Sequence, residues 1–168
     1  MTANVSQVFQ KMVEHESGIP HRVAHFAKVY AYAKAIGELE GLPERMQNIL
    51  EVAAVMHDVG IRPSEEKRGC CYGYYQQIDG PAPARAILEA LGQDEALIER
   101  VCWLIAHHHT FTNVDGPDHR ILLEADFLVN IFEGGFSRKQ VDNIRRNVFR
   151  TQSGLMFLQH MFYNRQAE

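Results

Sequence analysis

The sequence predicts an all-α fold, a compact bundle of eight or nine helices. Apolar residues recur at three- and four-residue steps along almost all of the 168 residues, which is the spacing of one helix face. Alternation of apolar and polar residues, the pattern of a half-buried strand, is not sustained anywhere in the chain. Glycine and proline separate the apolar segments at intervals that suit helices of ordinary length.

Three helices are expected in the first part of the chain. Their approximate ranges are Val5–Val13, His21–Leu39 and Glu44–His57. Gly18 and Pro20 separate the first helix from the second. Pro20 lies near the start of the second helix, where proline is tolerated. In the third helix the run Val52–Met56 is apolar on every side, so this helix is expected to be central and buried.

The helical periodicity breaks between Gly60 and Gly80. Only short helical pieces fit this segment, around Ser64–Arg68 and Tyr72–Gln77. Irregular segments of this length inside a compact domain are often functional, so we expect substrate contacts from it.

Five more helices are expected after this segment. Their approximate ranges are Pro81–Leu91, Asp94–His107, His119–Glu133, Arg138–Phe149 and Gly154–Asn164. Ser137 is a suitable N-cap for the fourth of them. With no repeat, low-complexity segment or linker, residues 1–168 are interpreted as one domain, with core motifs at about 20–135 and C-terminal helices at 137–164 packed on it. The apolar last helix either caps the core or pairs with a second chain in a homodimer.

Composition and charge argue against several classes of protein. Seventeen basic and 21 acidic residues give a formal net charge of −4, which argues against dedicated nucleic-acid binding. Three cysteines, two of them adjacent, do not form the even framework of a secreted disulfide-rich domain. The N-terminal segment lacks the cationic start and apolar run of a signal peptide, and no run of about 18 apolar residues is present to span a membrane. We therefore expect a cytoplasmic protein.

Polar residues in apolar surroundings are the informative part of the chain. His57 and Asp58 follow a fully apolar stretch, Asp126 lies inside another, and His25 lies on the inward side of the second helix. A buried carboxylate must be paired or bound to a metal, because an isolated buried charge is very costly. Two histidines and two aspartates suit a divalent ion such as Mn, Fe, Ni, Co, Zn or Mg rather than a thiolate site.

The order of these residues, His25, then His57-Asp58, then Asp126, resembles the H…HD…D signature of the HD superfamily of metal-dependent phosphohydrolases. The surrounding sequences are also similar to the motifs of that family, over about residues 20–135. They read HFAKVYAYA from His25, LEVAAVMHDVGI around the pair and LEADFL around Asp126. The resemblance implies an HD-domain helical bundle in which these four residues bind one metal.

A run of three histidines at residues 107–109 adds a second feature. His108 and His109 resemble a pair that helps to bind a second metal in the HD-GYP and cyclic-nucleotide phosphodiesterase branches, where the HD aspartate bridges both ions. Those branches also supply an earlier histidine, which residues 76–81 lack, so Asp79 is considered as an oxygen ligand in its place. Asp79 could equally be a turn or N-cap residue. The number of metals, one or two, stays open, and without a GYP element a cyclic di-GMP assignment is not supported.

The resemblance leads to a hydrolase that acts on a small phosphate mono- or diester, with a nucleotide as one such substrate. The bound metal would activate a water for attack on phosphorus. Asp58 is assigned both as a metal ligand and as the group that orients this water. A histidine of the 107–109 run, with His108 as the first candidate, is assigned to protonate the leaving oxygen.

The substrate phosphate needs a cation, and the sequence offers candidates of low specificity. Lys67 and Arg62 are the first choices, and Arg85 is a weaker one. Lys67 belongs to a short charge cluster, which is usually a solvated face. His21, four residues before His25, is assigned to the rim of the site, with a solvated structural role as the alternative.

Two other functions fit the same residues. Some HD-fold proteins use a di-iron site to activate oxygen, although the missing earlier histidine counts against that chemistry here. The other alternative is a non-catalytic domain that binds a metal or a ligand, although retention of all four ligands counts against it. The natural substrate is not readable from the sequence.

Overall fold

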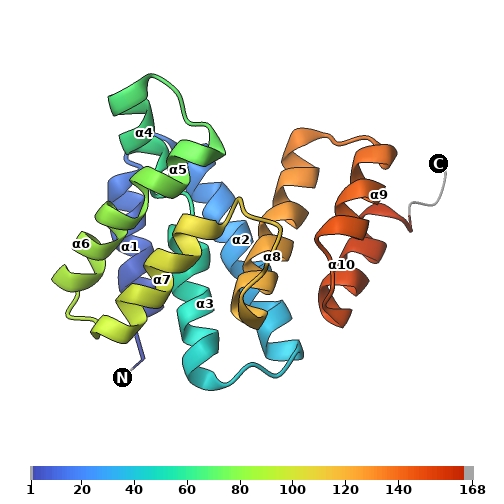
Figure 1. The fold of residues 1–168 in the computed structure, drawn as a ribbon, viewed down its shortest axis with the longest axis horizontal. Helices are drawn as coiled ribbons and strands as arrows, with labels where there is room; N and C mark the ends of the chain where they lie inside the picture. The colour runs from blue at the N-terminus through green and yellow to red at the C-terminus, as the bar shows by residue number, and fades with distance from the viewer. Residues whose placement is uncertain (1, 165–168) are drawn as a thin grey trace.

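The computed structural model describes residues 2–164, and in that range all the regular secondary structure is helical (Figure 1). The helices are α1 (Val5–His15), α2 (Pro20–Leu39), α3 (Glu44–Met56), α4 (Ile61–Arg68), α5 (Gly73–Asp79), α6 (Pro81–Ala90), α7 (Glu95–His107), α8 (Gly116–Gly134), α9 (Arg138–Asn147) and α10 (Gln152–Phe162). No strand is present among these residues, so the predicted all-α class is confirmed. None of these helices is long and apolar enough to cross a membrane.

The eight longer helices are those that the periodicity predicted, with ends that differ by a few residues. Helix α3 ends at Met56, so His57 and Asp58 lie in the turn after it. Helix α8 begins at Gly116, three residues earlier than expected, because Pro117 is accommodated in its first turn. The short helices α4 and α5 are the pieces expected between residues 60 and 80.

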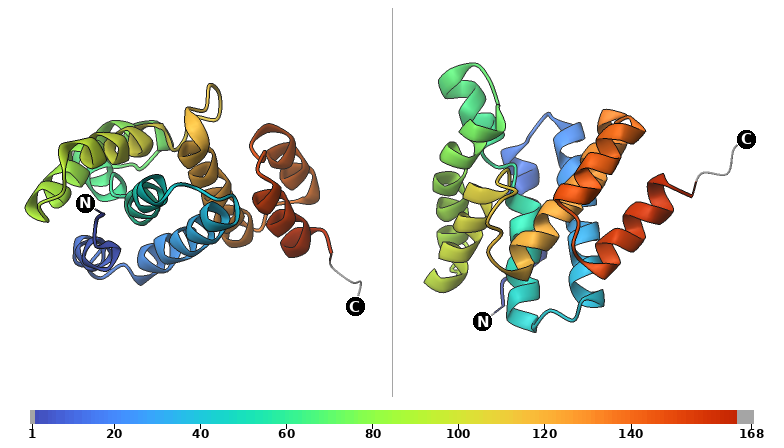
Figure 2. Two further views of the ribbon diagram at one scale, coloured as in Figure 1. Left: turned by 90° about the horizontal axis from the view of Figure 1, so that it is seen from below. Right: turned by 45° about the vertical axis from the view of Figure 1, so that its right-hand side comes forward.

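Helix α3 lies at the centre of the bundle. It packs against α1, α2, α7 and α8, which surround it in the view along its axis (Figure 2, left). All of its residues from Leu50 to Met56 are buried, as the all-round apolar run predicted. The polar pair that follows α3 is therefore enclosed by neighbouring helices.

A close approach at Gly60 determines how the chain leaves α3. A Cβ atom on this residue would lie 2.5 Å from the carbonyl oxygen of Gln76 and 2.9 Å from the backbone nitrogen of Gly80. Because both neighbours are backbone atoms, a larger residue would require the backbone to move. The contact brings α5 against the turn that carries His57 and Asp58, and it places Gln76 beside that turn.

The helices α9 and α10 form a hairpin beside α8, on the side away from α6 (Figure 1). Helix α10 packs against both α8 and α2. The buried carboxylate of Glu124 in α8 accepts hydrogen bonds from the backbone N–H groups of Arg150 and Thr151, at 2.6 and 2.9 Å. Glu40, after α2, accepts one from the backbone N–H of Ser153 at 2.8 Å. These bonds attach the start of α10 to the central helices.

Candidate metal centre

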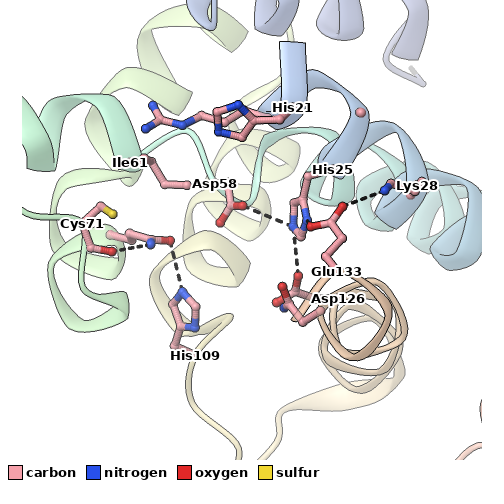
Figure 3. A pocket seen from close by; sticks show the side chains of 13 residues that line it. His21, His25, Lys28, Asp58, Ile61, Cys71, His109, Asp126 and Glu133 are labelled. Atoms are coloured by element: carbon pink, nitrogen blue, oxygen red, sulfur yellow. Dashed lines mark hydrogen bonds and ion pairs between the residues drawn. The ribbon is translucent and has the colours of Figure 1, made fainter. Parts of the chain in front are cut away.

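Side chains from two helices and two turns meet near the C-terminal end of α3. They are His25 from α2, His57 and Asp58 from the turn after α3, His108 from the turn after α7, and Asp126 from α8. His25 Nε2 lies 3.2 Å from His57 Nε2 and 3.3 Å from Asp58 Oδ2. Asp126 Oδ1 lies 3.2 Å from His25 Nε2 and 3.5 Å from His57 Nε2. The structure thus brings together the four residues that the sequence singled out as ligands, and Figure 3 shows three of them around one cavity.

The Nδ1 atoms of His25, His57 and His108 each form a hydrogen bond with an oxygen atom. The partners are Ala54 O for His57 (2.8 Å), Ile105 O for His108 (2.7 Å) and Glu133 Oε2 for His25 (2.9 Å). Carbonyl and carboxylate oxygens accept hydrogen bonds, so each Nδ1–H donates and each Nε2 of the neutral ring carries a lone pair. These lone pairs face the two aspartates, and the centre is built from acceptors.

Acceptor atoms at this spacing repel one another unless a positive charge, a proton or a metal ion, lies between them. Ligands at about 2.0–2.1 Å from a metal are about 2.9–3.4 Å apart when they are neighbours. The contacts among the four residues, 3.2–3.5 Å, lie close to that spacing. His25, His57 and Asp58 offer ligand atoms that are all within 4.8 Å of one another. The donor set therefore fits a divalent cation.

Two buried atoms at the centre strengthen this fit. Asp126 Oδ1 and His108 Nε2 make no hydrogen bond with any residue that the structure describes. Buried polar atoms are nearly always satisfied, so an orphaned one needs an explanation such as an ion. Both orphaned atoms are acceptors, which is the type that a cation would satisfy.

The charges at the centre are strongly coupled. Burial opposes a charge on His57, but Asp58 and Asp126 outweigh this effect and raise its pKa well above 6.5. Burial likewise opposes ionisation of Asp58, yet His57 and His108 hold the pKa of that carboxyl well below its usual value. Burial also opposes ionisation of Asp126, but His25 and His57 hold the pKa of that carboxyl below its usual value. Both aspartates are therefore ionised at neutral pH, and a metal would displace protons from the histidines when it binds.

Asp58 faces two groups of ligands. Its Oδ2 atom faces His25 and His57, whereas its Oδ1 atom lies 3.5 Å from His108 Nε2. Asp58, His108 and His109 form a second group whose ligand atoms all lie within 4.8 Å of one another. A bridging carboxylate between two metals needs this arrangement, and the second metal stays a prediction.

Gln76 lies in the stretch where the two-metal branches supply their earlier histidine. Its Oε1 atom lies 3.1 Å from His109 Nε2, and its Nε2 donates to the carbonyl oxygen of Cys71 at 2.7 Å. Gln76 Oε1 accepts, so His109 Nε2–H donates to it. Burial, together with the charge of His108, lowers the pKa of His109 to about 4, and this ring is neutral at pH 7.

The structure gives Asp79 a different role from the ligand role considered for it. Its buried carboxylate accepts hydrogen bonds from Ser64 Oγ at 3.1 Å, Lys67 Nζ at 3.3 Å and Arg68 Nε at 3.0 Å. The bond from Arg68 is the main reason why the pKa of Asp79 is lowered. Asp79 thus attaches α5 to α4 and is not part of either ligand group, and two of its three partners on α4, Lys67 and Arg68, already neutralise its charge.

The three cations proposed to bind phosphate are likewise engaged elsewhere. Lys67 pairs with Asp79, and Arg62 donates to the carbonyl oxygen of Ser17 at 3.1 Å. Arg85 pairs with three glutamates of α6 and α7. None of the three is among the described residues that line the cavity at the metal centre.

That cavity has a volume of about 680 Å³, and His25, Asp58 and Asp126 are in its wall (Figure 3). His21 is exposed and also lines it, in keeping with the rim position expected for this residue. Lys28, a further basic residue in the wall, is paired with Glu133 at 2.7 Å. A cavity of this size and polarity suits a small charged ligand.

Several polar wall residues were not singled out from the sequence, namely Arg22, Lys28, Gln76, Asn130 and Glu133. Asn130 and Glu133 follow Asp126 by four and seven residues, so they share its helix face, and this spacing could have identified them. Lys28 likewise follows His21 by seven residues and shares its helix face. Gln76 carries no such signal, because its position depends on the backbone contact at Gly60.

Comparison with known proteins adds the family and the fold. The family model described as HD domain matches residues 22–131. A crystal structure of a predicted HD superfamily hydrolase from an uncultured Thermotogales bacterium has a TM-score of 0.68 with this chain. The two are 19% identical in sequence, and the match covers 95% of this chain and 86% of the other. At that identity the likeness shows the fold. No curated protein matches the chain.

Proposed function

The chain belongs to the HD domain family, and on this basis we propose that it is a metal-dependent phosphohydrolase for a small phosphate mono- or diester. His25, His57, Asp58 and Asp126 would bind the metal. The observation that carries the proposal is the convergence of histidine Nε2 lone pairs and aspartate oxygens on one position beside an open cavity.

A divalent ion at this position supplies two effects, a lower pKa of bound water and neutralisation of charge on a phosphoryl group. The protein's own residues supply orientation. Asp58, which faces both ligand groups, is proposed to orient the water. His108 is only 1% exposed, so its proposed part in moving a proton runs through Asp58 rather than through direct contact with a leaving oxygen.

The proposal is tested by metal analysis of the purified protein together with a phosphate-release screen. The screen uses nucleotides and simple phosphate esters with Mn, Co, Ni and Mg added separately. Loss of a group that only hydrogen-bonds a metal ligand typically lowers metal affinity roughly 10–100-fold. We expect His57→Ala and Asp58→Ala, which remove ligands themselves, to lower it further and to abolish hydrolysis. His160→Ala, at an exposed position in α10, is the matched control. Full metal content and activity in Asp58→Ala would contradict the proposal.

A di-iron oxygenase is a second candidate because Asp58 lies between two ligand groups. Such an enzyme would contain about two irons per chain and consume oxygen with an organic substrate. Iron at that ratio, oxygen uptake and no phosphate release in the screen would favour it. A tightly bound ligand with no turnover under any metal would instead favour the non-catalytic alternative.

A further inference from the structure

A second cavity adjoins the one at the metal centre. Its volume is about 470 Å³, and it shares four wall residues with the first: His109, Asp126, Asn130 and Glu133. The two cavities therefore adjoin at Asp126, one of the proposed metal ligands.

The remaining wall of the second cavity is largely aromatic. Phe111, Phe127 and Phe136 line it, and the rings of Phe111 and Phe127 lie 5.1 Å apart between centroids at an angle of 58°. Phe111 is 39% exposed, so part of its ring is accessible to a ligand in this cavity. Among the described residues, the wall of the first cavity contains no aromatic ring other than those of histidines.

The position of Phe136 is fixed by a glycine. A Cβ atom at Gly134 would lie within 2.4 Å of a ring carbon of Phe136, so the ring can lie against the last turn of α8 only because residue 134 has no side chain. The chain reverses at Gly135, whose φ of 59° is left-handed. The paired glycines thus place the third aromatic ring at this cavity.

Asn130 lies at the junction of the two cavities. It follows Asp126 by one helical turn and lines both cavities. Its side-chain amide makes no hydrogen bond with any residue of the described range 2–164. An amide presents one acceptor and two donors, so it can bind the donor and acceptor edge of a flat heterocycle.

We propose that the second cavity binds the organic part of the substrate and that this part is a planar heteroaromatic ring system. The inference rests on the proposed function, which places the phosphate at the metal centre. Phe111 and Phe127 offer ring faces for stacking, and Asn130 binds the edge of the ring. A purely aliphatic chain would leave the amide of Asn130 unpaired against apolar surface, which is costly.

The first experiment compares kcat/KM for two phosphate monoesters, adenosine 5′-monophosphate and glycerol phosphate. We expect a preference of at least roughly tenfold for the nucleotide, since stacking of one base on aromatic side chains contributes about that much or more. Phe111→Ala should remove most of the preference, because it should lower kcat/KM for the nucleotide by much more than kcat/KM for glycerol phosphate. Tyr74→Ala, which removes an exposed aromatic ring outside both cavities, is the control. Equal kcat/KM values for the two esters in the wild-type protein would overturn the inference.

The second experiment measures the binding of adenosine, which has no phosphate, by titration calorimetry. We expect binding by the wild-type protein, roughly tenfold weaker binding by Phe111→Ala and by Asn130→Ala, and no change for Tyr74→Ala. Binding that follows this order without any phosphate release would support the aromatic cavity while it contradicts the hydrolase. Hydrolysis of both esters without adenosine binding would retain the hydrolase and overturn the aromatic cavity.

Discussion

The three histidine rings at the metal centre are held by partners of two kinds. Backbone carbonyl oxygens hold His57 and His108, whereas the side chain of Glu133 holds His25. Glu133 is itself fixed by an ion pair with Lys28. Among these three rings, the orientation of His25 is the one that a single side-chain substitution can release.

Replacement of Glu133 by alanine is therefore expected to weaken metal binding. Removal of a carboxylate partner of a ligating histidine typically costs about 10–100-fold in metal affinity, because the ring loses its tautomer and its orientation. The measurement is a competition titration with a chromophoric chelator. Glu38→Ala, which removes an exposed carboxylate from α2, should leave the affinity unchanged. An affinity of Glu133→Ala equal to that of wild type would show that His25 does not depend on this partner.

The residue types at the centre were predictable because each stands out in an apolar segment. His25, Asp58 and Asp126 could be named from sequence since a buried charge demands a partner. The hydrogen bond from Arg68 to Asp79 could not be predicted, because it depends on how α4 and α5 pack. The same is true of Gln76, which reaches His109 only through the fold.

At the scale of elements, the connection between α7 and α8 is held by one buried histidine. His119 Nε2 donates to the carbonyl oxygen of His107 at 3.0 Å, and its Nδ1 accepts from the backbone N–H of Asp115 at 3.1 Å. Arg100 in α7 adds bonds to Asp115 and Asp118 at the start of α8. The neutral ring of His119 satisfies both backbone groups, and a protonated ring would lose the second bond.

The contribution of His119 to the stability of the protein should therefore fall in mild acid. Burial lowers the pKa of His119 in the folded state, so the unfolded chain, with a value near 6.5, binds a proton first. The contribution of this residue is fully present above pH 6.5 and is lost as the pH falls below it. The raised pKa values of His25 and His57 act in the opposite direction, so the test is the difference between two proteins. From pH 7.5 to 5.5 the free energy of unfolding in urea should fall more, or rise less, for the wild-type protein than for His119→Gln. His160→Gln, at an exposed position, should retain the wild-type pH dependence. An equal decrease in His119→Gln and wild type would contradict this role.

The helices themselves were predictable from periodicity, and their ends less so. The start of α8 depends on Gly116, whose φ of 87° few other residues adopt, and on the bonds of the preceding loop. The end of α3 at Met56 depends on the turn that Gly60 permits. In both places contacts distant in sequence determine where the helix stops, and local propensity does not contain them.

At the scale of the whole molecule, the metal centre joins segments that are far apart in the chain. Its residues come from α2, from the turns after α3 and α7, and from α8. Unfolding separates these segments, so a metal that binds them together binds the folded protein and not the unfolded chain. Metal binding and folding are linked in this arrangement.

A divalent metal that binds here should raise the stability of the wild-type protein. At a free concentration of 100 times Kd the expected gain is about 2.7 kcal/mol in the free energy of unfolding. For a chain of this size that gain corresponds to a rise in Tm of roughly 5–11 °C. Thermal unfolding with and without metal measures it. Asp58→Ala should show no such gain, whereas His160→Ala should show the full one. A metal-independent Tm in wild type would contradict a metal centre at these residues.

The general architecture follows from the sequence, but the two adjoining cavities do not. The all-round apolar run from Val52 to Met56 already indicated the central helix. The aromatic wall needs Phe111 and Phe136, which precede and follow α8 and line one cavity only when that helix is in place. The aromatic wall of this cavity arises from tertiary packing, which the sequence pattern does not contain.

The stacking around Trp103 gives the molecule an optical property. The indole lies 3.9 Å from the ring of His107 at an angle of 14°, with the guanidinium of Arg100 4.7 Å from its centroid. The chain contains one tryptophan, so all indole emission comes from this position, five residues before His108. The intrinsic fluorescence of the unlabelled protein therefore reports on the histidine run at residues 107–109, and it can be read while metals or substrates are titrated.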